Sequence, residues 1–171
     1  MTVQEDLLAV LADRMAIQDL IVRYAKARDT TDPEIYRQIF APDAVIALSN
    51  GKVMSENLEE IVAKSLSDQV RFNPDRQEGV VTYALMRHDV SNMNVELSGD
   101  TARSDYYVNT LAYNDVEKRP EIIAAGRIED DYVRREGRWW IVRSTLVIGW
   151  GNEEMGKRLQ VGEHTPPQYR R

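Results

Sequence analysis

The chain has 171 residues, of which 43% are hydrophobic and 29% are charged, a balance typical of one soluble globular domain with a substantial core. Its net charge of −6 argues against a nucleic-acid-binding surface, and the absence of cysteine excludes disulfides, thiol nucleophiles and thiolate metal sites. No apolar run approaches the ~20 residues of a membrane span, and the acidic N-terminus is unlike a signal peptide, so we expect a cytoplasmic protein.

The N-terminal part of the chain predicts helices. Residues 13–29 carry apolar residues at helical spacing, namely Ile17, Leu20, Ile21 and Tyr24. The pattern leaves open whether this helix is separate from, or continuous with, a preceding one. It ends before Pro33, because proline cannot continue a helix. A short helix is expected after Asp32-Pro33, and a third opens at Ser55.

The C-terminal half predicts strands. Turn and loop signals separate four segments rich in β-branched and aromatic residues, at 80–97, 101–113, 121–135 and 138–150. A shorter apolar run at 44–48 precedes the turn Ser49-Asn50-Gly51 and predicts a hairpin. Helices followed by strands indicate an α+β fold, in which a curved antiparallel sheet wraps a helical layer and leaves a cavity against it.

The polar stretches predict a loop and a tail. Residues 72–79 are polar and contain a proline, which is typical of a loop. We expect residues 1–150 to form one domain. Residues 151–171 are expected to form a tail that packs on that domain or on a neighbouring subunit.

Four stretches occur in an order that resembles a known family. They are DRMAIQDLIVRYAKARD (13–29), FAPDAV (40–45), RHDVSNMNVELSGDTA (87–102) and DDYVRREGRWWIV (130–142). They resemble the SnoaL-like branch of the NTF2-like superfamily over about residues 13–150. The resemblance implies an NTF2-like cone. It is greatest to cofactor-independent lyases, which include hexachlorocyclohexane dehydrochlorinase, bile acid dehydratase and, more distantly, scytalone dehydratase.

This resemblance implies catalytic roles for His88, Asp29 and Tyr24. In those lyases a histidine–aspartate dyad removes a proton from carbon, and the bile acid enzyme has a tyrosine five residues before its aspartate, as Tyr24 stands before Asp29. The chemistry suits these residue types, since histidine is a base near neutral pH and an aspartate on its second ring nitrogen fixes the tautomer. The alternative is that His88 is an ordinary core or surface histidine, Asp29 a cap, and Tyr24 a core aromatic.

A geometric condition applies to Tyr24 and Asp29, the two of these residues that lie on the helix. A spacing of five places Tyr24 ~140° from Asp29 around an ideal helix. Both therefore reach one cavity only if the helix end unwinds or the sheet wraps around it.

Five further residues are predicted to bind substrate: Ile46, Met86, Asn92, Tyr107 and Arg127. Ile46 stands where the dehydrochlorinase has an aromatic residue, so the pocket lining differs. Arg127 is expected inside a strand, where an inward, paired arginine can bind an anionic or carbonyl group. Tyr107 and its neighbour Tyr106 point to opposite faces, so one of them lines the cavity.

The sequence favours an enzyme without metal or cofactor, because it has no HExxH motif and no phosphate-binding glycine loop in a strand–turn–helix context. The resulting hypothesis is a dehydratase-like lyase acting on a hydrophobic small molecule. The alternatives are an isomerase or polyketide-type cyclase with the same dyad, or a non-catalytic ligand-binding or assembly module. A homo-oligomer, trimer or dimer, is expected, with no nucleic-acid or membrane partner.

Overall fold

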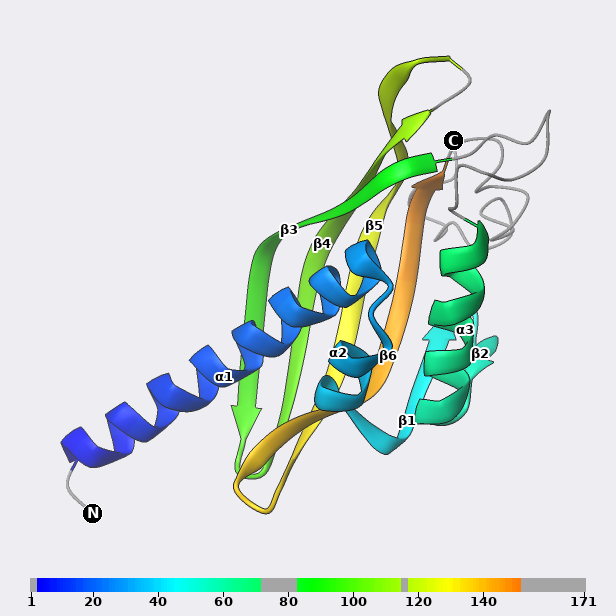
Figure 1. Cartoon of the computed structure of the whole chain (residues 1–171). Coiled ribbons are helices and arrows are strands. Elements are labelled where there is room, and N and C mark those ends of the chain that lie inside the picture. The colour runs from blue at the N-terminus through cyan, green and yellow to red at the C-terminus, as the bar shows by residue number, and fades with distance from the viewer. Residues whose placement is uncertain (1–2, 72–82, 115–116, 152–171) are drawn as a thin grey trace.

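The computed structural model describes residues 3–71, 83–114 and 117–151, which form three helices and a six-stranded sheet (Figure 1). The helices are α1 (Val3–Thr30), α2 (Pro33–Ile39) and α3 (Leu58–Arg71). The strands are β1 (Phe40–Leu48), β2 (Val53–Ser55), β3 (Tyr83–Ser98), β4 (Thr101–Asn114), β5 (Arg119–Arg135) and β6 (Arg138–Gly151). The predicted loop at 72–79 and the tail from 152 onward lie outside the described residues.

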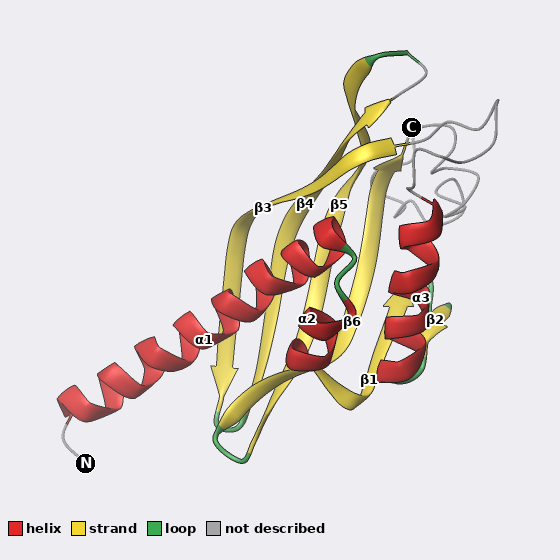
Figure 2. Ribbon diagram, in the orientation of Figure 1, coloured by secondary structure: helices red, strands yellow, loops and turns green. Residues whose placement is uncertain are grey.

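The sheet has the strand order β2-β1-β6-β5-β4-β3, and the helices lie on one face of its curve (Figure 2). Strands β3 to β6 form the predicted antiparallel meander, and β1 with β2 forms the predicted hairpin. One prediction is wrong: the sheet is mixed, because β1 runs parallel to β6. A parallel pair needs a long connection between its strands, and here α3 and the meander supply it.

Helix α1 is one continuous helix rather than two. Its second half is buried on the sheet side at Ile17, Leu20 and Ile21, whereas most of its earlier turns are exposed. It crosses the sheet mainly beside β3 (Figure 1). Thr31, with a left-handed φ of 50°, follows its last residue and turns the chain towards α2.

Asp13 fastens the middle of α1 to the sheet. Its carboxylate accepts hydrogen bonds from Arg134 at 2.7 Å and from the indole N–H of Trp139 at 2.9 Å. The Arg134 guanidinium also lies 4.7 Å from the centroid of the Trp139 ring. Such charge-assisted contacts are stronger than neutral hydrogen bonds, so they fix where α1 crosses the strands.

Strands β5 and β6 approach closely at Gly126. A Cβ atom built there would lie 2.4 Å from the carbonyl oxygen of Val147, which no side chain tolerates. Glycine is therefore required at this position. The close approach lies in the wall of the cavity described next.

Candidate functional site

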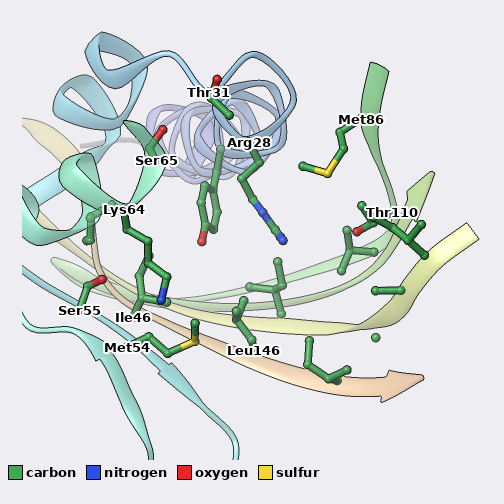
Figure 3. A pocket seen from close by; sticks show the side chains of 18 of the residues that line it. Arg28, Thr31, Ile46, Met54, Ser55, Lys64, Ser65, Met86, Thr110 and Leu146 are labelled. Atoms are coloured by element: carbon green, nitrogen blue, oxygen red, sulfur yellow. The ribbon is translucent and has the colours of Figure 1, made fainter. Parts of the chain in front are cut away.

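A cavity of about 140 Å³ lies between the helices and the concave face of the sheet (Figure 3). Most of its wall is aliphatic. The apolar lining includes Ile46, Ile61, Val108, Ile123, Ile128, Leu146 and Ile148. Polar side chains from α1, α3, β2 and β4 interrupt this lining, including Arg28, Lys64, Ser55 and Thr110. An apolar hollow with a few polar groups is the usual form of a small-molecule site.

Asp29 and His88 are in contact beside this cavity. The Asp29 carboxylate oxygen Oδ1 lies 2.7 Å from His88 Nδ1 and also accepts the backbone N–H of His88 at 2.8 Å. An ionised carboxylate can only accept, so Nδ1 carries the proton and the lone pair of the neutral ring is on Nε2. Within the described part of the chain, no residue is hydrogen-bonded to Nε2.

Two local features bring these side chains together. Asp29 lies in the last turn of α1, two residues before the left-handed residue Thr31, which ends the run of helical backbone. His88 follows an irregularity of β3, where the pairing with β4 shifts register between Ala84 and Arg87. Such bulges bend a strand and re-aim its side chains. The dyad therefore depends on a helix end and a strand distortion, both local.

Burial decides the charge of His88. Its side chain is only 2% exposed, and this desolvation, together with the nearby positive charge of Arg28, lowers its pKa to about 4 although Asp29 opposes the shift. The imidazole is therefore neutral at pH 7. A neutral imidazole held by a carboxylate is the protonation state that a general base requires.

Tyr24 lines the cavity and is otherwise part of the aromatic core. Its ring packs edge-on against Phe40 with centroids 5.0 Å apart, and against Tyr36 at 6.2 Å. Burial raises the pKa of its hydroxyl, so it stays protonated and can donate a hydrogen bond. Tyr24 faces the core while Asp29 faces β3, and the curved sheet brings both near one cavity.

The dyad stands behind the cavity wall rather than in it. Neither Asp29 nor His88 is among the residues that line the hollow, but their neighbours are. Arg28 precedes Asp29 in α1, and Thr110 is the register partner of His88 on β4. The dyad is therefore next to the cavity along both elements, although neither of its side chains is part of the wall.

The predicted substrate-binding residues divide into two groups. Ile46 and Met86 line the cavity (Figure 3). Tyr107 is 48% exposed, and its register partner is Arg127 on the outer face of the sheet. Its neighbour Tyr106 is the one that points inward, with only 1% exposed. Neither tyrosine is among the residues that line the cavity, so the expectation that one of them does is not met. Strand alternation predicts opposite faces without saying which is inner.

Arg127 and Asn92 also differ from expectation. Arg127 contributes to the wall of the cavity, but its guanidinium pairs with Glu129, on the face of β5 opposite to Ile128. Asn92 is exposed, has a left-handed φ of 52° and lies in a second register shift between β3 and β4. It is a bulge residue and not part of the cavity.

A buried carboxylate that the sequence analysis missed lies beneath the helices. Asp130, which is 2% exposed, accepts hydrogen bonds from the hydroxyls of Tyr106 at 2.9 Å and Tyr132 at 3.2 Å. Burial raises the pKa of Asp130 to about 6, while hydrogen bonds oppose the shift. Ser144 neighbours this carboxylate and lowers its pKa, although its hydroxyl and Asp130 Oδ1 form no hydrogen bond of regular geometry with a described residue. Alternation with Ile128 and Tyr132 was the signal that could have identified it.

Two further findings concern partners. Among the described residues, no group of three or more His, Cys, Asp or Glu side chains is arranged to hold a metal ion. Within the same part of the chain, every helix is too short or too polar to cross a lipid bilayer.

Comparison with known proteins agrees with this architecture. An uncharacterised protein of Mycobacterium tuberculosis is 27% identical over 139 residues, which cover 79% of this chain and 84% of that protein. The solved structure of the hexachlorocyclohexane dehydrochlorinase LinA, type 2, superposes with a TM-score of 0.68 at 19% identity, covering 84% of this chain and 89% of that one. A candidate scytalone dehydratase of Novosphingobium aromaticivorans gives a TM-score of 0.65 at 19% identity, covering 82% and 86%.

The two structural likenesses show a common fold, since their identities are low. The family assignment comes from sequence: the model of the SnoaL-like domain matches residues 9–145. That range contains most of α1, the dyad and all but the end of the sheet. The chain therefore belongs to the SnoaL-like domain family and has the NTF2-like fold predicted from its sequence.

Proposed function

We propose that this protein is a cofactor-independent lyase that carries out a dehydratase-like elimination on a hydrophobic small molecule. The observation that supports it is the 2.7 Å contact between Asp29 and His88 beside an apolar cavity. Members of the same fold include the dehydrochlorinase LinA, which its name describes as removing hydrogen chloride. In this proposal His88 is the base, Asp29 orients it, and Tyr24 donates a hydrogen bond.

The proposed reaction uses the free lone pair of His88. Nε2 takes a proton from a carbon beside a carbonyl group, and the electron pair forms a carbon–carbon double bond as the hydroxyl departs from the next carbon. The imidazolium then gives its proton to the departing hydroxyl, which leaves as water, and His88 is neutral again. Asp29 stabilises the imidazolium that forms, which offsets the low pKa of His88. The protonated hydroxyl of Tyr24 donates a hydrogen bond to the carbonyl or the departing oxygen.

One observation favours a second function, that of a non-catalytic binding module. His88 is almost fully enclosed, and neither member of the dyad forms part of the cavity wall. On this alternative the Asp29–His88 contact only fastens α1 to β3. A binding module retains ligand affinity when His88 is replaced, whereas the lyase loses turnover.

The experiment is incubation with a panel of β-hydroxy ketones, followed by mass spectrometry for the loss of one water. The parent protein should form the dehydrated product, and His88→Asn should be slower by about 10²–10⁴-fold. A product of unchanged mass would instead indicate the isomerase or cyclase alternative. Equal rates in the parent protein and His88→Asn, or no product from either, would contradict the lyase proposal.

Two expectations about the protein in solution belong with this proposal. The homo-oligomer, trimer or dimer, remains a prediction that light scattering on a sizing column measures directly. The cytoplasmic location likewise remains a prediction, which fractionation of the source cells would check.

A further inference from the structure

The cavity has a charge opposite to that of the protein. The chain carries 28 acidic against 22 basic residues, yet no aspartate or glutamate is among the described residues that line the cavity. Two cationic side chains from different helices enter it. Figure 3 shows the nitrogen ends of Arg28, from α1, and Lys64, from α3, directed into the space above the sheet. The cavity is therefore apolar and electropositive.

Arg28 is the more informative of the two cations. It is half-buried and forms no ion pair with any described residue, and its guanidinium lies 5.8 Å from the centroid of the Tyr24 ring. Two carboxylates near the cavity are already engaged, Asp29 by His88 and the buried Asp130 by tyrosine hydroxyls. A guanidinium in an apolar surrounding is costly unless an anion pairs with it, and its planar fork matches a carboxylate.

Two hydroxyl groups in the wall also have unmet hydrogen-bonding capacity. Ser55 is 1% exposed and Ser65 is 5% exposed, and the hydroxyl oxygens of both are buried without a hydrogen-bond partner among the described residues. Both residues line the cavity. Buried hydroxyls normally find a partner, so a polar ligand group would satisfy them.

We propose that the cavity binds a carboxylate-bearing molecule about the size of one aromatic ring, with its carboxylate held by Arg28. This inference rests on the proposed function and names the substrate class of the same site. The size follows from the volume of about 140 Å³, close to that of an apolar cavity of ~150 Å³ that holds benzene. The aliphatic wall contacts the ring, and a second polar group of the ligand hydrogen-bonds to the hydroxyl of Ser55 or to that of Ser65.

Binding of the carboxylate has a consequence for the dyad. The charged groups that face His88 are Asp29 and Arg28 on α1 and Asp89 on β3, and of these Arg28 lowers its pKa. An anion paired with Arg28 cancels that effect. The substrate itself therefore makes His88 a stronger base once it is bound.

The test compares benzoate with its uncharged analogue benzamide, titrated by nuclear magnetic resonance at the amides of Met86 and Thr110, which line the cavity. Benzoate should bind the parent protein more tightly than benzamide does. Arg28→Gln should weaken benzoate binding about 10–100-fold, because one charge-assisted hydrogen-bonded pair contributes that much to affinity. The same variant should leave benzamide binding unchanged. Arg28→Lys should restore part of the loss.

Arg87→Gln is the matched control, because Arg87 is an exposed arginine next to His88 that pairs with Asp89. It should leave benzoate binding unchanged. Equal affinities for benzoate and benzamide, no benzoate binding at millimolar concentration, or an equal loss in Arg28→Gln and Arg87→Gln would overturn the inference. The binding test does not depend on turnover. If benzoate binds in an Arg28-dependent way but no elimination product forms, the lyase proposal is rejected and the carboxylate site stands.

Discussion

Two aspartates, Asp29 and Asp130, carry their carboxylates to the helix-covered side of the sheet in different ways. Asp29 ends α1, its side chain is 27% exposed, and its carboxylate contacts an imidazole that has a free lone pair. Asp130 is fully enclosed in β5, and its carboxylate accepts hydrogen bonds from the hydroxyls of Tyr106 and Tyr132. The first carboxylate lies beside the cavity and is partly exposed, whereas the second is enclosed.

The difference shows what a carboxylate does in each place. Near Asp29 the neighbouring imidazole stays neutral, which is the protonation state that a base requires. Around Asp130 the surrounding hydroxyls already act as donors, and burial makes protonation easier instead. The proposed function therefore places the chemistry at the helix end, and we expect the carboxylate in the strand to contribute to stability.

The largest expected effect separates the two carboxylates by activity. Asp29→Asn should lower turnover of a dehydration substrate by about 10²–10⁴-fold, because the amide cannot stabilise the imidazolium. Asp130→Asn should leave turnover near that of the parent protein. The measurement is the initial rate at saturating substrate. Equal losses in both variants would show that the two carboxylates do not have separate roles.

The next effect separates them by stability. Asp130→Ala should lower the free energy of unfolding by about 2–5 kcal/mol, because two buried tyrosine hydroxyls lose their acceptor. Tyr106→Phe, which removes only one of the hydrogen bonds, should cost ~1 kcal/mol. Urea titration followed by tryptophan fluorescence gives both values. A loss in Asp130→Ala no larger than that of Tyr106→Phe would contradict the closed arrangement.

A third effect, which reaches its full size only at one end of a pH range, is a difference in pH dependence. The pKa of Asp130 is raised from 3.8 to about 6, so between these pH values the folded protein retains a proton that the unfolded chain releases. The contribution of Asp130 to the free energy of unfolding therefore falls as the pH rises through that window. Asp130→Asn should therefore gain stability relative to the parent protein between pH 4 and 6, by up to ~3 kcal/mol.

His88 should act in the opposite direction. Its pKa is lowered from 6.5 to about 4, so stability is lost as the pH falls through that window, when the unfolded histidine takes up a proton. Urea titrations at several pH values test both signs, with His88→Asn as the second variant. If the free energy of unfolding depends on pH in the same way in the parent protein and in Asp130→Asn, the pKa of Asp130 is not raised in the folded protein.

The regular elements could be predicted because they follow from local patterns. Helical spacing identified the buried face of α1, and turn signals placed the strand ends within a few residues of those observed. β1 begins earlier than predicted, since Phe40 already pairs with Ile141 of β6. That pairing joins segments about a hundred residues apart, and no local pattern reveals it or its parallel direction.

The candidate site could be predicted only in part. The resemblance to the lyases indicated Tyr24, Asp29 and His88, and the structure brings the last two into contact. Arg28 and Asp130 also lie in the stretches that carry the resemblance, at 13–29 and 130–142, but the resemblance implied no role for either of them. The outward positions of Tyr107 and Arg127 depend on which alternate residues of each strand face the helices. Register shifts in β3 and β5 change which residues these are along the strand.

The sequence by itself determined the order of helices and strands, the fold class and the family, because hydrophobic periodicity and turn chemistry act over a few residues. The tertiary structure alone decided that the sheet is mixed, that the dyad stands behind the cavity wall, and that the cavity is lined by arginine and lysine without a carboxylate. These features arise where distant segments meet across the curved sheet. Their distances and charges are properties of packing, which no single stretch of the chain contains.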